Sequence, residues 1–430
     1  MKKSKLKQII KECILENKQV CTNAPNISDK KQDGGISHEP HMRVRSDEPE
    51  PFGYDTGMDI NTDIQNEMVL PPGFTTTTIE DLPSIDDDMI KEAVPGREVG
   101  DDEFSSYLKR VASKEKSPSD KFKYPFVHRS NIVDENGESL NEEHLKQQIK
   151  KRPEKILKQN KKIGKSGGQD YVFYNIGLPA LKGLVVDEST NKFKIIDTCP
   201  GAGACRVYCY AKRGGYVQFK RASMSQTQLL NFLVNDWQGF KDKLINELKV
   251  EYKKYSKKNA KIIVRWHDSG DFFSPDYLRI AYDIAEALPD ITFYAYTKMA
   301  SAAVGNKPKN FVMNFSQGAL PEQEKQVDTK QTKHSVVVPK QLADEFSHKE
   351  GDEENRKVVW NSPTDLDKFK TKMANKYGIQ KDTILTYDEL MKLPYDPQTA
   401  TPKWNAIIVA GDGDDAAMRN DVLGVYLLWH

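Results

Sequence analysis

The sequence has few cysteines, no long apolar run and almost no net charge. Five cysteines in 430 residues are too few for the disulfide framework of a small secreted protein. No run of about 18 apolar residues occurs, which argues against a membrane-spanning helix. The 64 Lys and Arg residues and the 63 Asp and Glu residues leave a formal charge of +1. We therefore do not expect a protein that coats nucleic acid with a broad basic surface.

The beginning of the chain is basic but lacks the apolar segment of a secretory signal, so we expect a cytoplasmic protein. Residues 1–19 carry apolar side chains at helical spacing, which predicts a short amphipathic helix. Residues 20–100 are rich in Asn, Asp, Gly, Pro and Thr, and such a segment buries too little apolar surface to fold. Residues 1–100 are thus predicted to be a mostly disordered tail with a short N-terminal helix.

Residues 101–165 return to helical spacing and are interpreted as a helical lead-in to a core that spans residues 166–430. In the core, strands alternate with helices, which is typical of an α/β fold. A long helix with Ser225 as its cap and a second helix that begins at Ser274 are predicted. The predicted strands are YVFYNIGLPAL, LKGLVVD, NKFKIIDTC, KIIVRWHD, ITFYAYTK, NFVMNFSQG, HSVVVPK and NAIIVAGDG.

Most of these strands end in a polar cluster. The clusters are Asp197-Thr198-Cys199, His267-Asp268-Ser269-Gly270-Asp271, Thr297-Lys298, Asn314-Phe315-Ser316 and Gly411-Asp412-Gly413-Asp414-Asp415. Ligands of parallel α/β folds bind at the carboxyl ends of the strands, so we expect a shared site, with ordinary loop polarity as the alternative. A crossover through the long helix is expected to place the strand before Cys199 beside the strand that ends at His267.

Cys199, Cys205 and Cys209 lie in TCPGAGACRVYCYAKRGG with the spacing C-x5-C-x3-C. The proline and glycines of this segment predict a loop, which is able to turn all three thiols towards one point. Three thiolates are one ligand short of a closed zinc site, and they also leave one iron of a [4Fe–4S] cluster open. The pattern favours an iron–sulfur cluster, with zinc and His267 or a carboxylate as one alternative and unrelated buried thiols as another.

The segment TCPGAGACRVYCYAKRG, with GLPAL before it and RWHDSGDFFSPDYLRIAYDIAEALPDITFYAYTK after it, resembles the phage gene product 88 family. It is also similar to radical-SAM-like iron–sulfur proteins of phages. The second resemblance implies a partial (β/α) barrel with a [4Fe–4S] cluster on Cys199, Cys205 and Cys209. It further implies S-adenosylmethionine (SAM) at the open iron. The cysteine spacing departs from the usual C-x3-C-x2-C at both gaps.

The resemblance to radical SAM proteins also implies roles for residues around the cysteines. Tyr208 matches the aromatic residue that packs near the adenine. The other residues implied to bind the cofactor follow the strand ends and are Ser269, Gly270, Asp271, Thr297, Lys298, Asn314 and Ser316. The candidate catalytic residues are His267, Asp268 and Asp271.

The leading hypothesis is a phage-encoded, radical-SAM-like [4Fe–4S] protein of the host cytoplasm, with an unknown substrate. The alternative is a non-catalytic protein whose fold is stabilised by zinc or an iron–sulfur cluster. Such a protein would bind nucleic acid or a partner protein from the phage or the host. An open metal site distinguishes the two hypotheses, because a saturated fourth ligand favours the structural role.

Overall fold

The computed structural model describes residues 96–113, 124–133, 142–159, 171–212, 219–350, 357–397, 399–409 and 412–428. All of them belong to the unit Tyr54–His430. The predicted N-terminal helix, and the predicted disorder up to residue 95, lie outside the described residues.

The central feature is an eight-stranded sheet in the order β11-β12-β13-β8-β7-β6-β5-β2, in which every neighbouring pair is parallel. The strands are β2 (Tyr171–Ile176), β5 (Lys261–Trp266), β6 (Thr292–Thr297), β7 (Phe311–Ser316), β8 (His334–Val338), β11 (Ile384–Thr386), β12 (Trp404–Val409) and β13 (Val422–Leu428). The predicted α/β class is confirmed. Among the described strands, β2 and β11 each have one neighbour in this sheet, so it is not closed, and the partial barrel remains a prediction.

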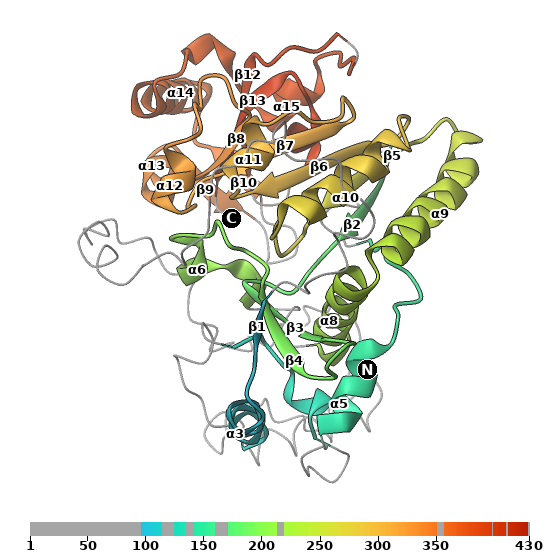
Figure 1. Cartoon of the computed structure of the whole chain (residues 1–430). Helices are drawn as coiled ribbons and strands as arrows, with labels where there is room; N and C mark the ends of the chain where they lie inside the picture. Colours follow the sequence, from blue (N-terminus) through green and yellow to red (C-terminus); the bar gives the residue numbers. More distant parts are fainter. Residues whose placement is uncertain are drawn as a thin grey trace, which may run out of the picture. The chain divides into compact units, whose positions relative to one another are not determined.

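Both faces of this sheet are covered, which explains why its strands are apolar at nearly every position. On one face, Val264, Trp266 and Phe293 belong to a core shared with the helices α8 (Lys220–Asn235), α9 (Trp237–Ser256) and α10 (Pro275–Glu286) (Figure 1). On the other face, Ile263 and Tyr294 pack with the short helix α16 (Asp415–Met418). Successive strand residues point to opposite faces, so each strand contributes to two cores.

The long predicted helix is two helices, so the single helix and its cap at Ser225 were wrong. The chain bends at Asp236, which has φ −147° and ψ 69° and separates α8 from α9. The side chain of Asp236 accepts a hydrogen bond of 2.8 Å from the backbone N–H of Gly239 and so caps α9. The second predicted helix begins as expected, because Ser274 Oγ accepts a hydrogen bond from the N–H of Tyr277 at the start of α10.

The strand before Cys199 does not lie beside the strand that ends at His267, so that prediction was wrong. It is β4 (Phe193–Asp197), which pairs antiparallel with β3 (Lys182–Val186) and β1 (Arg97–Glu98) in a separate sheet. The parallel neighbour of β5 is β2. The crossover through α8 and α9 therefore joins β2 to β5, and the β3–β4 hairpin is inserted in this connection.

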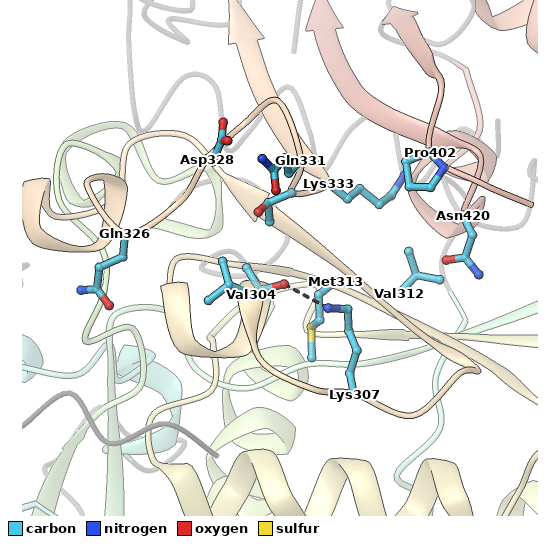
Figure 2. A pocket seen from close by; sticks show the side chains of 12 residues that line it. Val304, Lys307, Val312, Met313, Gln326, Asp328, Gln331, Lys333, Pro402 and Asn420 are labelled. Carbon is cyan, nitrogen blue, oxygen red and sulfur yellow. Dashed lines mark hydrogen bonds between the residues drawn. The ribbon is translucent and has the colours of Figure 1, made fainter. Parts of the chain in front are cut away.

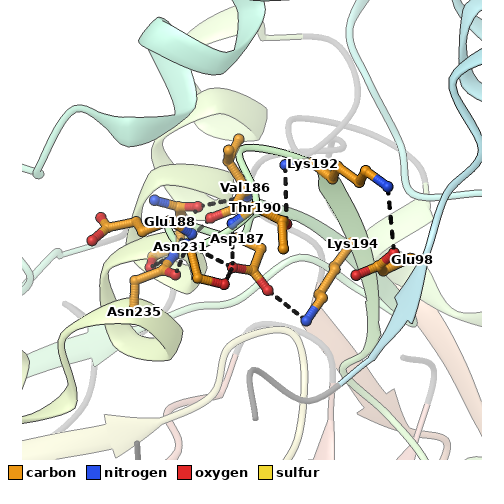
Figure 3. A network of polar contacts seen from close by, with 10 residues as sticks. Glu98, Val186, Asp187, Glu188, Thr190, Lys192, Lys194, Asn231 and Asn235 are labelled. Atoms are coloured by element: carbon orange, nitrogen blue, oxygen red, sulfur yellow. Dashed lines mark hydrogen bonds and ion pairs between the residues drawn. The ribbon is translucent and has the colours of Figure 1, made fainter. Parts of the chain in front are cut away.

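A tight polar turn explains why β3 and β4 form a hairpin. The carboxylate of Asp187 accepts hydrogen bonds from the N–H and the hydroxyl of Ser189 and forms an ion pair of 2.5 Å with Lys194 (Figure 3). Asn231 of α8 accepts a hydrogen bond of 2.8 Å from the N–H of Val186. These bonds hold the hairpin on α8. Its outer face packs with α3 (Asp101–Ala112) and α5 (Glu142–Lys150), the helices of the predicted lead-in.

The remaining elements connect or cover the strands. A second antiparallel pair is formed by β9 (Ser347–Glu350) and β10 (Lys357–Trp360). The other helices are α11 (Ala300–Val304), α12 (Pro321–Glu324), α13 (Lys340–Asp344), α14 (Pro363–Tyr377) and α15 (Tyr387–Met391). The 3-10 turns are η4 (Arg129–Asn131), η6 (Tyr210–Lys212) and η7 (Lys381–Thr383).

The side chain of Asn310 connects the end of α10 to the sheet, and its substitution tests this connection. Its amide nitrogen lies 2.9, 3.0 and 2.9 Å from the carbonyl oxygens of Ala285, in the last turn of α10, and of Leu288 and Ile291, which follow the helix. We expect Asn310→Ala to lower the free energy of unfolding by about 1–3 kcal/mol, because the carbonyls lose their donor. Urea unfolding followed by circular dichroism measures this. The matched control is the exposed neighbour in Lys309→Ala. Equal stability of the two variants would contradict this role.

Candidate functional site at the carboxyl edge of the sheet

The cysteine loop, residues 198–212, lies across the carboxyl ends of β5, β6 and β7. Its backbone is bonded to the segment after β7: Gly203 and Cys205 each donate to the carbonyl of Gly318 at 3.1 Å, and Leu320 donates to Gly201 at 2.8 Å. The carbonyl of Thr198 accepts a hydrogen bond of 2.7 Å from the N–H of Asp271, after β5. Hydrogen bonds from the ends of β5 and β7 thus hold the loop that carries the cysteines.

Glycine is needed where this loop meets its neighbours. A Cβ atom at Gly201 would lie 2.5 Å from the carbonyl oxygen of Lys298, and one at Gly203 would lie 2.3 Å from that of Ala319. Real Cβ atoms do not approach backbone atoms this closely. The two glycines of the CPGAGAC segment therefore allow the loop to contact the ends of β6 and β7 directly.

Asp271 is the residue that ties the strand ends together. Its carboxylate is buried, and its Oδ1 accepts hydrogen bonds of 2.7 Å from the hydroxyl of Thr297 and from the N–H of Phe272. Its Oδ2 accepts a hydrogen bond of 2.7 Å from the N–H of Lys298. Burial raises the pKa of Asp271 to about 6, although these bonds favour the charged form.

His267 has the left-handed backbone angle φ 67° and is held among aromatic rings. Its Nε2 lies 2.7 Å from the hydroxyl of Tyr277, and its ring packs edge-on against Phe272. Burial lowers the pKa of His267 to about 3, so the ring is neutral at physiological pH. Its Nδ1 has no hydrogen-bond partner among the described residues. Its catalytic or metal-binding role stays a prediction.

Asp268 lies two residues after the end of β5 and faces β2. Its Oδ2 accepts a hydrogen bond of 2.7 Å from the amide of Asn175, and its backbone carbonyl accepts one from the hydroxyl of Tyr210. A Cβ atom at Gly177 would lie 1.9 Å from Asp268 Oδ1, so glycine leaves the room that this carboxylate occupies. Asp268 therefore connects β2 to the end of the cysteine loop.

The predicted cofactor-binding residues divide into two groups. Ser269, Gly270, Thr297, Lys298 and Ser316 lie at the strand ends that hold the loop, and Lys298 Nζ donates to Ser316 Oγ at 2.6 Å. Asn314 is buried under α16 instead, where its amide donates to the carbonyl of Ala417 at 3.0 Å. The side chain of Tyr208 lies outside the described part of the structure.

The acidic cluster after β12 is engaged by neighbouring residues. Asp414 Oδ2 forms an ion pair of 2.6 Å with Arg265 of β5 and accepts a hydrogen bond of 2.9 Å from the hydroxyl of Tyr294. Asp415 Oδ2 accepts a hydrogen bond of 2.6 Å from Tyr387. These contacts connect α16 to the sheet and to α15.

The three thiols differ in their protonation. Burial raises the pKa of Cys199 to about 12, with Asp271 contributing, and the N–H of Leu181 lies 3.3 Å from its sulfur. A hydrogen bond from the Cys209 thiol lowers the pKa of Cys205, and the charge of Lys298 adds to this effect. The same hydrogen bond raises the pKa of Cys209. Cys205 is thus the thiol of the loop that loses its proton most readily.

The three cysteine thiols are the kind of ligand that a thiophilic metal prefers, but the structure does not arrange them as a metal site. Cys199, Cys205 and Cys209 are close enough for their charges to shift one another's pKa. Yet in the part of the chain that the structure describes, no group of three or more His, Cys, Asp and Glu side chains is arranged to hold a metal ion. Binding of a metal or cluster would therefore require the thiols to reorient.

Two residues at this edge, Arg206 and Gln226, were not predicted from the sequence to belong to the site. Arg206 donates from Nε to the carbonyl of Ala202 at 2.7 Å and from Nη2 to Asp197 at 2.9 Å, so it fixes the loop from within. Gln226 of α8 donates to the hydroxyl of Ser269 at 2.8 Å. Arg206 is one of several basic residues in the loop, and Gln226 lies 43 positions before its partner in the sequence, so neither residue is distinguished by the sequence pattern.

A cavity of about 500 Å³ lies at the opposite, amino edge of the sheet (Figure 2). Its lining includes Lys307, Lys333 and Asn420, and none of the predicted site residues. Lys333 Nζ donates to the carbonyls of Ala416, Arg419 and Val422 at 2.7–3.0 Å, so its hydrogen-bonding capacity is used within the fold.

Comparison with known proteins identifies the family. Residues 147–382 match the family model of gene product 88. The chain belongs to the gene product 88 family. It is 30% identical over 154 residues to the gene 88 protein of Mycobacterium phage D29 and 29% identical over 154 residues to that of Mycobacterium phage L5.

Each of these two alignments covers 33% of the chain, and they cover 55% and 56% of the relatives, so the chain spans about half the length of the curated relatives it matches. No solved structure matches it. The predicted resemblance to phage gene product 88 proteins is thereby confirmed. The matches name no cofactor, so the iron–sulfur and SAM roles stay predictions. None of the helices in the described ranges is long and apolar enough to span a membrane.

Gly203→Ala tests whether the cysteine loop must contact the end of β7. The new Cβ would meet the backbone of Ala319, so the loop should move and expose the buried thiol of Cys199. We expect faster labelling of Cys199 by a maleimide, measured by peptide mass spectrometry. Gly100→Ala is the matched control, because nothing lies within 4 Å of a Cβ atom there. Unchanged labelling in Gly203→Ala would show that the contact is dispensable.

The reactivity of Cys205 tests the hydrogen bond between the two thiols. In reduced, metal-free protein, alkylation of Cys205 by iodoacetamide should rise through a midpoint below the usual thiol pKa of about 8.5, because only the thiolate reacts. Cys209→Ala should move the midpoint to higher pH, since it removes the bond that stabilises the thiolate. Lys298→Met should have a smaller effect in the same direction, and Lys309→Met none. A wild-type midpoint above pH 8 would contradict this geometry.

Proposed function

We propose that the gene product 88 core is a cluster-binding protein in which Cys199, Cys205 and Cys209 hold a [4Fe–4S] cluster at the carboxyl edge of the sheet, with SAM as its co-ligand. The observation that carries this proposal is the attachment of the cysteine loop by hydrogen bonds to the ends of β5 and β7, together with its close contact with the end of β6. The carboxyl edge is where parallel α/β proteins bind ligands, and the thiols reach it from a loop that the sheet holds in place.

The protein supplies the three thiols in different states. Cys205 loses its proton most readily, whereas the buried Cys199 and the hydrogen-bonded Cys209 would lose theirs on binding. The N–H of Leu181 points at the sulfur of Cys199 and would stabilise its charge. A bound cluster with an open iron would supply an electron for reductive chemistry on a sulfonium ligand.

Asp271 acts as a positioning residue in this proposal. Its two oxygens accept hydrogen bonds from Phe272, Thr297 and Lys298, so it fixes the loops around the cluster. The exposed side of the edge offers the ammonium of Lys298 and the hydroxyl of Ser316 to a polar ligand. These groups suit the carboxylate and the ribose hydroxyls of SAM.

A second candidate function is structural. Arg206, Gly201 and Gly203 already fasten the loop to the sheet and to itself, so zinc or a saturated cluster would reinforce an existing contact. In that case the protein would bind nucleic acid or a protein partner without catalysis. The nature of the metal and its response to SAM separate the two candidates.

Anaerobic reconstitution with iron and sulfide tests the proposal. We expect brown protein with about four iron and four sulfide per chain. Cys205→Ala should lose most of both, because it removes a ligand. Cys21→Ala is the matched control, since this cysteine lies outside the loop. Iron and sulfide are determined chemically, and addition of SAM should change the electron paramagnetic resonance spectrum of the reduced cluster.

Two results would separate or overturn these candidates. One equivalent of zinc without sulfide, lost in Cys205→Ala, would support the structural role and overturn the cluster. A cluster whose spectrum does not respond to SAM would keep the cluster and remove the SAM-dependent chemistry.

A further inference from the structure

Lys158 is a partly buried lysine at the carboxyl edge that the sequence does not single out. Its backbone forms an antiparallel bridge with Asn175, near the end of β2, through hydrogen bonds of 3.0 and 2.7 Å. This bridge directs the side chain towards α8, where Nζ donates a hydrogen bond to the hydroxyl of Ser225. Burial lowers the pKa of Lys158, and the nearby charge of Asp268 partly opposes this.

Lys158 differs from three other cations of this edge, which are Arg265, Arg206 and Lys298. Arg265 pairs with Asp414 at 2.6 Å, and Arg206 pairs with Asp197 at 2.9 Å. Lys298 faces the thiolate of Cys205. Among the residues that the structure describes, none places a carboxylate within ion-pair distance of Lys158, whose hydrogen bond goes to a neutral hydroxyl. Asp268 compensates this charge only in part, from beyond ion-pair distance, and a partly buried ammonium without a direct counter-ion is costly.

Lys158 and Ser225 both have hydrogen-bond donors that no described residue accepts. The ammonium has three N–H groups and gives one to Ser225. Because Ser225 Oγ accepts that bond, its own O–H points elsewhere, and no described residue accepts a hydrogen bond from it. Both side chains are only partly buried, so a ligand is able to reach them. Two neighbouring donors with one excess positive charge are the features of an oxyanion site.

We propose that Lys158 and Ser225 form an oxyanion subsite of the carboxyl-edge site, which binds a phosphate or carboxylate group of the substrate. The inference rests on the proposed function, because it takes this edge as the place where the reaction occurs. The subsite is next to the proposed centre: Asp268 lies near Lys158, and its carbonyl is bonded to Tyr210, the residue after Cys209.

Competitive labelling of lysine tests the subsite. The full chain, purified anaerobically and reconstituted, is treated with a trace of acetic anhydride, with and without inorganic pyrophosphate or malonate. Labelling of each lysine is read by mass spectrometry. With an anion at about four times its Kd, labelling of Lys158 should slow about fivefold, because only the free fraction reacts. Protection by pyrophosphate alone identifies a phosphate ligand, and protection by malonate alone identifies a carboxylate.

Internal and matched controls make the result specific. The exposed Lys257, at the end of α9, should label at the same rate with and without the anion. Ser225→Ala removes one donor but keeps Lys158, and it should reduce the protection. Ser256→Ala, an exposed serine at the end of α9, should leave it unchanged. Equal slowing at Lys158 and Lys257, no slowing with either anion, or full protection in Ser225→Ala would overturn the subsite.

Iron and sulfide measured in the same samples keep the two proposals apart. Protection of Lys158 in protein that holds no cluster would support the subsite and count against the cluster. A cluster in protein whose Lys158 is not protected would support the cluster and count against the subsite.

Discussion

The buried carboxylate of Asp271 is the interaction on which the carboxyl edge depends. It accepts hydrogen bonds from its own turn and from the end of β6, while its N–H binds the carbonyl that precedes Cys199. A buried carboxylate is stable only while its acceptors are satisfied, so a shift of any partner leaves a costly unpaired charge. The ends of β5 and β6 and the start of the cysteine loop therefore keep one relative position.

The sequence predicted local elements better than their pairing. The strands and the start of α10 follow from apolar runs and from Ser274, which are local signals. The apolar segments of β3 and β4 carry the same signal as the parallel strands, so their separate antiparallel sheet was missed. The turn at Asp187 decides their pairing, and its contacts with Lys194 and Asn231 of α8 are not readable from spacing. The break between α8 and α9 was likewise missed, because Asp236 is a single polar residue within a helical pattern.

The polar clusters in the sequence indicated the carboxyl edge of the sheet, but they did not show which of their side chains face it. His267 and Asp271 are four residues apart, and one is surrounded by rings whereas the other joins three segments. Asn314 ends up under α16 because it lies on the opposite face of β7 from the α10 core. Lys158 arrives from a segment before β2, through a bridge that has no sequence signature. Long-range packing decides these positions.

The strand order explains why helices cover both faces of the sheet. From β2 to β8 the chain adds strands in one direction, and right-handed crossovers then place α9 and α10 on one face. From β11 to β13 it adds strands in the opposite direction, so the same handedness places α15 and α16 on the other face. The Arg265–Asp414 ion pair joins this second half to β5. The second half of the sheet thus reaches the carboxyl edge through Asp414, which is bound to the same strand whose end holds the cysteine loop.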